Sequence, residues 1–219
     1  MRVLKTNFYD SPNIGMYCYC CNSYCLVPHG VIEKYGKEIS EVLNVPVYEI
    51  SVAGTPLIGV FLAGNDNCLL VPEIMFKYER AVLEKNNIKY EVIKTKNTAL
   101  GNNICANNNG AIIGHDFEPA AVKKISEALG VPVKKATIGG MDIVGSVCVA
   151  NDRTAIAHNN ITDKEKAAAE SLLKAKILPV TIDSNPHVRA GIIVNNSGYL
   201  VTENIKTKEI ILIDQTLNE

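Results

Sequence analysis

Residues 58–72 read IGVFLAGNDNCLLVP, and the same arrangement occurs five times along this chain of 219 residues. Each copy has a glycine, an apolar stretch, a turn with Asn or Asp, and a second apolar stretch. The other copies are IGMYCYCCNSYCLVP at 14–28, LGNNICANNNGAIIG at 100–114, VGSVCVANDRTAIAH at 144–158 and AGIIVNNSGYLV at 190–201. Their glycines are Gly15, Gly59, Gly101, Gly145 and Gly191, so successive copies are 44, 42, 44 and 46 residues apart. A period of this length indicates a stacked or radial repeat architecture.

Each copy predicts the element order β-β-α-β. The two apolar stretches around each Asn-containing turn indicate a hairpin, because Asn, Asp and Gly tolerate the backbone conformations of tight turns. A helix is expected next in four copies, within 32–43, 72–82 and 119–130 and, in the fourth, opening at 162–165. Pro119 suits a first helical turn, Gly130 suits a helix end, and Thr162 with Glu165 forms a capping box. Short strands are then expected at 47–52, 90–93, 133–138 and 180–182.

The two ends of the chain each hold part of one repeat. Residues 2–5 resemble the strand that follows each helix, and they have no helix before them. After Val201 we expect no helix, because residues 210–213 are predicted as a strand; the fifth copy is then degenerate. Partial repeats at both ends predict a closed ring, which removes open sheet edges. The sequence therefore predicts one α/β domain over 1–219, with five β-β-α-β repeats at 1–46, 47–89, 90–132, 133–179 and 180–219 around a pseudo-fivefold axis.

The overall composition narrows the class of partner. The chain is 47% hydrophobic, and its formal net charge is −1. Such a charge provides no global field for phosphate backbones, so DNA is not expected as a partner and free RNA is not expected as the only one. We find no apolar run long enough for a membrane span and no signal peptide, and we expect a soluble cytoplasmic protein.

The repeats resemble the translation initiation factor 6 family over essentially the whole chain. The most specific stretches are Leu100-Gly101-Asn102, Gly64-Asn65-Asp66 with 69–72, and 149–152. The resemblance implies the pentein fold and, by its length, the archaeal form. It also implies a monomer without a cofactor that binds the intersubunit face of the large (50S) ribosomal subunit, through ribosomal proteins and nearby ribosomal RNA. Such a factor prevents premature association with the small (30S) subunit and takes part in large-subunit maturation.

The Asn-containing turns are the predicted binding surface. In a ring they gather on one rim, where amide groups can both donate and accept hydrogen bonds. For any single Asn, turn geometry alone is the stronger interpretation. The resemblance adds Val60 and Asn107, and changing both (Asn107→Ser with Val60→Glu) is expected to weaken subunit binding without unfolding the ring. The candidate ribosome-binding residues are Val60, Asn65, Asp66, Asn107, Asn108, Asn151, Asp152, Asn195 and Asn196.

Enzymes that modify guanidino groups share the pentein fold and are the main alternative. They use a nucleophilic Cys late in the chain, whereas the last Cys here is Cys148, in the fourth copy. Cys18, Cys105 and Cys148 recur at equivalent strand positions, which favours packing over nucleophilic function. The four cysteines at 18–25 form no paired C-x2-C motif and have no second cluster beside them, so no structural zinc site is expected. His29, His115 and His158 also recur, as expected from pseudo-symmetry, although a ring of them could line a central channel. A generic ring-shaped interaction module is the third class.

Overall fold

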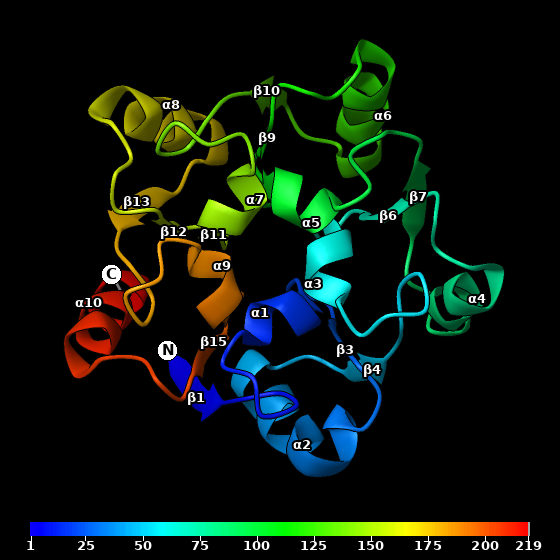
Figure 1. The fold of residues 1–219 in the computed structure, drawn as a ribbon, viewed down its shortest axis with the longest axis horizontal. Helices are drawn as coiled ribbons and strands as arrows, with labels where there is room; N and C mark the ends of the chain where they lie inside the picture. Colours follow the sequence, from blue (N-terminus) through cyan, green and yellow to red (C-terminus); the bar gives the residue numbers. More distant parts are fainter. Residues whose placement is uncertain (219) are drawn as a thin grey trace.

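Five three-stranded sheets surround a central axis in the computed structural model, which describes residues 1–218 (Figure 1). In each sheet the first two strands are antiparallel and the third is parallel to the second. The sheets are β2(Tyr19–Cys20)-β3(Cys25–Val27)-β4(Val47–Glu49), β5(Ala63–Gly64)-β6(Leu69–Pro72)-β7(Tyr90–Ile93), β8(Ile104–Ala106)-β9(Ala111–Ile113)-β10(Val133–Lys135), β11(Cys148–Ala150)-β12(Thr154–Ala157)-β13(Lys176–Pro179) and β14(Ile192–Val194)-β15(Gly198–Thr202)-β1(Arg2–Thr6).

Each sheet has one helix on the outside of the ring and one short helical turn near the axis (Figure 1). The outer helices are α2(Val31–Leu43), α4(Lys77–Lys85), α6(Pro119–Leu129), α8(Asp163–Leu173) and α10(Thr207–Asn218). The inner turns are α1(Ile14–Tyr17), α3(Ile58–Phe61), α5(Leu100–Asn103), α7(Val144–Val147) and α9(Val188–Gly191). We call an inner turn, its hairpin, the following outer helix and the third strand one unit, numbered from one to five.

The predicted closure of the ring is confirmed. Strand β1 pairs in parallel with β15, from Arg2 opposite Gly198 to Thr6 opposite Thr202. The N-terminal strand thus completes the sheet of unit five, and the two termini lie in the same sector of the ring (Figure 1). The predicted caps are also confirmed: Pro119 begins α6, Gly130 ends it with φ +67°, and Thr162 and Glu165 cap α8.

Several predictions of local structure are wrong. The helix expected within 72–82 is α4, which begins only at Lys77. The glycine-containing segments form the inner helical turns, so the first hairpin strand begins later than expected. Residues 210–213 belong to α10, where Ile213 and Leu217 are buried and Ile211 is 50% exposed, which is a helical pattern. Unit five is therefore complete. The third strand of unit four is β13 at Lys176–Pro179, because β12 pairs there and leaves 180–182 outside the sheet.

In units one to four, the second residue of the inner turn is packed too closely for a side chain. A Cβ on Gly59 would lie 1.9 Å from the carbonyl oxygen of Gly15, and one on Gly101 would lie 2.0 Å from that of Gly59. In units two to four this glycine stands six residues before the hairpin Asn. The residue at that place in unit five is Arg189, so the alignment of Gly191 with the other four glycines is wrong.

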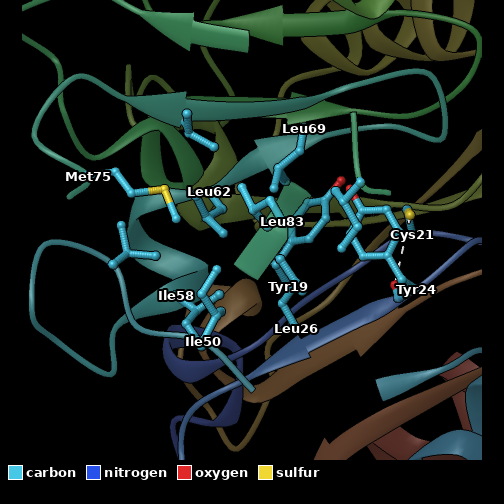
Figure 2. Close-up of a cluster of buried hydrophobic side chains, with 13 residues drawn as sticks. Tyr19, Cys21, Tyr24, Leu26, Ile50, Ile58, Leu62, Leu69, Met75 and Leu83 are labelled. Atoms are coloured by element: carbon cyan, nitrogen blue, oxygen red, sulfur yellow. Dashed lines mark hydrogen bonds between the residues drawn. The ribbon is translucent and has the colours of Figure 1, made fainter. Parts of the chain in front are cut away.

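The hydrophobic core consists of clusters that adjoining units build together. One cluster contains Tyr19 and Leu26 from unit one with Leu62, Leu69 and Leu83 from unit two (Figure 2). Another joins Cys105 and Ile112 of unit three to Ala169 and Leu173 of unit four. Each unit therefore depends on its neighbour to bury its apolar side chains.

Candidate functional site

A closed ring of hydrogen bonds surrounds the axis at the hairpin turns. In each unit a backbone N–H donates to a side-chain oxygen of the next unit, and the fifth bond returns to unit one. The bonds run from Asn22 to Asp66 (2.7 Å), from Asp66 to Asn108 (3.0 Å), from Asn108 to Asp152 (2.9 Å), from Asp152 to Asn196 (3.1 Å) and from Asn196 to Asn22 (2.8 Å). We call these five residues the polar ring and this end of the molecule the hairpin face.

Side chains of the polar ring also bind one another across the axis. The Asp66 carboxylate accepts bonds from the amides of Asn22 and Asn108, and the Asp152 carboxylate accepts from those of Asn22, Asn108 and Asn196. Burial raises the pKa of Asp66, but the bonds from Asn108 and Asn22 outweigh this, so the pKa lies below its ordinary value. Both donors and acceptors are thus fixed in place while their outer surfaces stay half-buried.

The other four candidate asparagines are buried between units. Each side-chain amide donates to a backbone carbonyl in the next unit: Asn65 to Asn107, Asn107 to Asn151, Asn151 to Asn195, and Asn195 to Cys21. Each side-chain oxygen accepts from two backbone N–H groups of its own turn. With exposures of 2–5%, these four side chains hold the turns and join the units.

Val60 lies at the opposite end of the axis, on what we call the helical-turn face. It borders a depression of about 320 Å³ together with Met16, Asn102 and Arg189. Arg189 and Gly15 also line a small cavity between this depression and the hairpin turns. Burial lowers the pKa of Arg189. The predicted rim therefore separates into two faces, and the double change at Val60 and Asn107 does not probe one continuous surface.

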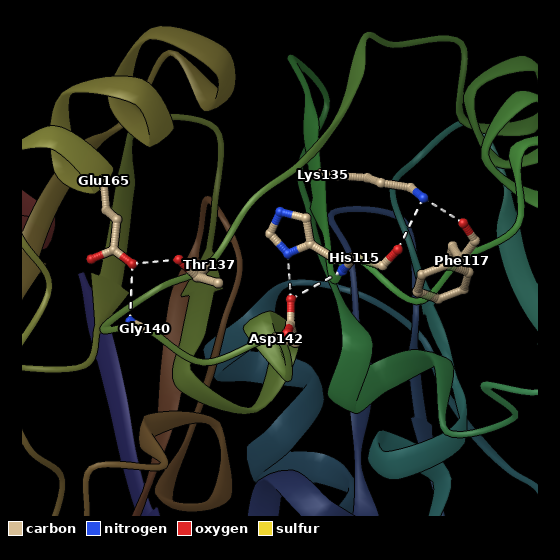
Figure 3. A network of polar contacts seen from close by, with 7 residues as sticks. All are labelled: His115, Phe117, Lys135, Thr137, Gly140, Asp142 and Glu165. Atoms are coloured by element: carbon tan, nitrogen blue, oxygen red, sulfur yellow. Dashed lines mark hydrogen bonds and ion pairs between the residues drawn. The ribbon is translucent and has the colours of Figure 1, made fainter.

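The recurring histidines do not line the central channel. Nδ1 of His29 lies 3.5 Å from the Glu49 carboxylate. Nδ1 of His115 lies 2.5 Å from the Asp142 carboxylate, at the outside of the ring (Figure 3). His158 is buried, and its Nδ1 accepts a bond from the backbone of Asn160. The structure therefore brings no two of these three residues together in a site.

The cysteine thiols are held in apolar surroundings. Six are buried and Cys20 is half-buried. Burial raises the pKa of Cys21 to about 12, while a bond with Cys105, together with burial, raises the pKa of Cys148. Such thiols are poor nucleophiles. Within residues 1–218 no three His, Cys, Asp or Glu side chains form a group suited to a metal ion.

Three glutamates were missed as organising residues. Glu79, Glu165 and Glu209 each stand at the third position of an outer helix and bind a hydroxyl 28 residues earlier, from Ser51, Thr137 and Thr181. Each also accepts bonds from two backbone N–H groups of the loop after that hydroxyl residue. Figure 3 shows the Glu165 example. The fixed spacing of 28 residues was the available sequence signal.

Comparison with solved structures gives the class of fold. The chain matches the N-terminal domain of an arginine dihydrolase from cyanobacteria with a TM-score of 0.51 and 13% identity, over 86% of this chain and 72% of that one. At this identity the match shows the fold alone, the pentein ring.

Sequence comparison gives the family. A model of the eIF-6 family matches residues 3–216. Translation initiation factor 6 of Staphylothermus marinus is 35% identical, over 100% of this chain and 98% of the relative. The factor of Saccharolobus islandicus is 32% identical over the full length of both chains. The chain belongs to the eIF-6 family of translation initiation factors.

The helices were compared with the requirements of a membrane-spanning segment. Within residues 1–218 none of them combines the length and the apolar character that crossing a bilayer requires.

Proposed function

We propose that this protein binds the large ribosomal subunit and sterically prevents the small subunit from joining it, with a role in large-subunit maturation. Full-length membership of the eIF-6 family carries this proposal. The protein acts in the cytoplasm as a monomer, without a cofactor and without bond chemistry. Occupancy of the joining surface is sufficient for the effect.

The hairpin face is the contact surface in this proposal. Its polar ring fixes carboxylate and amide groups of Asp66, Asn108, Asp152 and Asn196 around the axis. Exposed turn tips surround the ring: Ser23, Asn67, Arg153 and Ser197. A surface of fixed donors and acceptors with little net charge suits a partner composed of both protein and RNA. The buried asparagines act indirectly, by holding the turns that present this face.

Two charge substitutions separate the faces. Arg153→Glu changes an exposed tip of the hairpin face, and Val60→Glu adds a carboxylate to the helical-turn face. In gradient sedimentation with purified subunits, the wild-type protein is expected to travel with large and not small subunits. Arg153→Glu should weaken this binding and Val60→Glu should not. The reverse order would assign binding to the helical-turn face, and a protein that stays at the top of the gradient at low salt would refute the function.

Guanidino-group chemistry is not part of this proposal. A nucleophilic thiol requires a low pKa and a nearby base. Here burial raises the pKa of Cys21, and a bond with Cys105 together with burial raises the pKa of Cys148. We expect no release of citrulline from arginine or its derivatives, and thiol-dependent release would contradict a purely steric role.

A further inference from the structure

A groove of about 440 Å³ lies on the outside of the ring, where unit three meets unit four. Its floor is apolar and is formed by Ile112, Ile138, Ala168, Ala169 and Leu172. Glu165 of α8 lies on one side, while His115 and Lys135 lie on the other (Figure 3). We call this feature the α8–β10 groove. Its volume falls within the range of binding pockets, and its lining is mostly apolar with a few polar groups.

The groove exists because α8 has an alanine where the other outer helices have a large residue. The buried residue at this helical position is Ile39, Leu83, Ile125, Ala169 and Ile213 in units one to five. These residues are 44, 42, 44 and 44 apart, which is the spacing of the units themselves. The four large side chains fill the space beside their neighbouring sheet. Ala169 leaves that space open at this joint.

The charges at this joint also differ from those at the preceding one. Between units two and three, Lys124 of α6 lies 2.7 Å from Glu91 of β7. The register of the sheets places Lys134 at the position of Glu91, and Ala168 stands 44 residues after Lys124. The ion pair that closes the earlier joint is thus replaced by an exposed lysine opposite an alanine.

The remaining ionic groups at the rim leave an excess of positive charge. Lys164 is exposed on α8, and neither it nor Lys134 has an acidic partner within residues 1–218. The Glu165 carboxylate is occupied by the bonds from Thr137 and Gly140, and Asp142 is bound to His115. The rim is therefore complementary to carboxylates.

One side of the groove is an open strand edge. Strand β10 is the last strand of its sheet, and the groove follows five consecutive residues, 134–138. The N–H of Ala136 donates to Ile113 on the sheet side. Because the backbone groups of a strand alternate in direction, the N–H of Lys135, the last residue of β10, faces away from the sheet. An edge of this kind accepts an added strand.

We propose that the α8–β10 groove binds an extended acidic peptide that pairs with the edge of β10. Alternate side chains of the peptide are apolar and enter the space above Ala168 and Ala169, while its carboxylates lie near Lys134 and Lys164. At about 3.3 Å per residue, the five lining residues accommodate roughly five residues of peptide. The groove is remote from the polar ring, so this binding is independent of the proposed ribosomal contact.

The test uses the intact protein and a fluorescein-labelled seven-residue peptide that alternates Glu with Ile, followed by fluorescence anisotropy. A peptide that alternates Lys with Ile serves as the charge control and is expected to bind at least tenfold more weakly. Ala169→Leu supplies the residue type that unit two has at this position, and it should weaken binding of the acidic peptide at least tenfold. Ala167→Leu, on an exposed part of α8 outside the groove, is the matched control and should bind as the wild type does.

Two further measurements keep the test decisive if Ala169→Leu folds poorly. Lys134→Glu with Lys164→Glu changes only exposed side chains and should weaken binding at least tenfold. A peptide that is N-methylated at alternate residues cannot form the added ladder, and it should also bind at least tenfold more weakly. Equal binding of the acidic and basic peptides, or binding unaffected by the charge reversal, would overturn the proposal. Equal binding of the methylated peptide would overturn the strand pairing.

Discussion

Replacement of Asn107 by alanine is expected to destabilise the whole ring. The side chain is 4% exposed and makes four hydrogen bonds. Its amide donates to the carbonyls of Asn151 (2.9 Å) and Leu173 (2.8 Å), and its oxygen accepts from the N–H groups of Asn109 (2.9 Å) and Gly110 (3.1 Å). At about 1 kcal/mol for each bond lost, the free energy of unfolding should fall by roughly 4 kcal/mol.

Urea denaturation followed by circular dichroism measures this change. Asn102→Ala is the matched control, because Asn102 is half-buried on the helical-turn face and should change the stability by less than about 0.5 kcal/mol. A loss below about 1.5 kcal/mol for Asn107→Ala would show that the bonds between units contribute little. Because Asn107→Ser also removes these bonds, it is expected to lower stability. A loss of subunit binding by this variant therefore reports on the binding surface only if the variant is shown to be folded.

Three further outcomes are expected. Gly101→Ala places a Cβ 2.0 Å from the carbonyl oxygen of Gly59, so it should lower the thermal midpoint by several degrees in calorimetry; a midpoint unchanged from wild type would mean that the inner turns can separate at no cost. Burial opposes ionisation of Glu165, but bonds from Thr162, Gly140 and Thr137 lower the pKa of its carboxyl group to about 2. The ionised carboxylate therefore stabilises the folded protein fully above the unfolded pKa of about 4.3, and this stabilisation is lost as the pH falls toward 2. Glu165→Gln should therefore show a smaller loss of stability than wild type between these pH values, and an identical pH profile would contradict the assignment. The buried thiols should resist iodoacetamide in the native protein and react in urea, as measured by mass spectrometry; rapid native labelling of Cys21, whose pKa burial raises to about 12, would contradict this.

The sequence pattern predicts the elements of the ring correctly where the preference of the residues for helix or strand agrees with the contacts that the fold imposes on them. The strand predicted at 90–93 is β7, and residues 2–5 lie in the strand that completes unit five. In contrast, residues 210–213 are rich in Ile, which favours strands, but burial of Ile213 and Leu217 against unit five selects a helix. Arg189 was missed because Gly191 lies nearby and offered a plausible match in sequence alone.

The roles of the asparagines could not be separated from sequence. Asn65 and Asp66 are neighbours in the chain, yet one is 3% exposed and bridges units, while the other joins the polar ring. Turn geometry and contact between units both select Asn at the same position, because each repeats with the period of the chain. The two roles are told apart only in the folded ring, where the amides of Asn65, Asn107 and Asn151 reach carbonyl groups 42–44 residues away.

Pairing of β1 with β15 also affects how the protein is made. Strand β1 is synthesised before every other strand that the structure describes, and its partner begins 196 residues after Arg2, at Gly198. At about 5–20 residues per second, β1 waits roughly 10–40 s without its only strand partner. Units one to four can form the cores that they share in that time, whereas the joint between units five and one closes only after β15 has emerged. Growing chains are therefore exposed to pairing with another copy through β1 until β15 has been made.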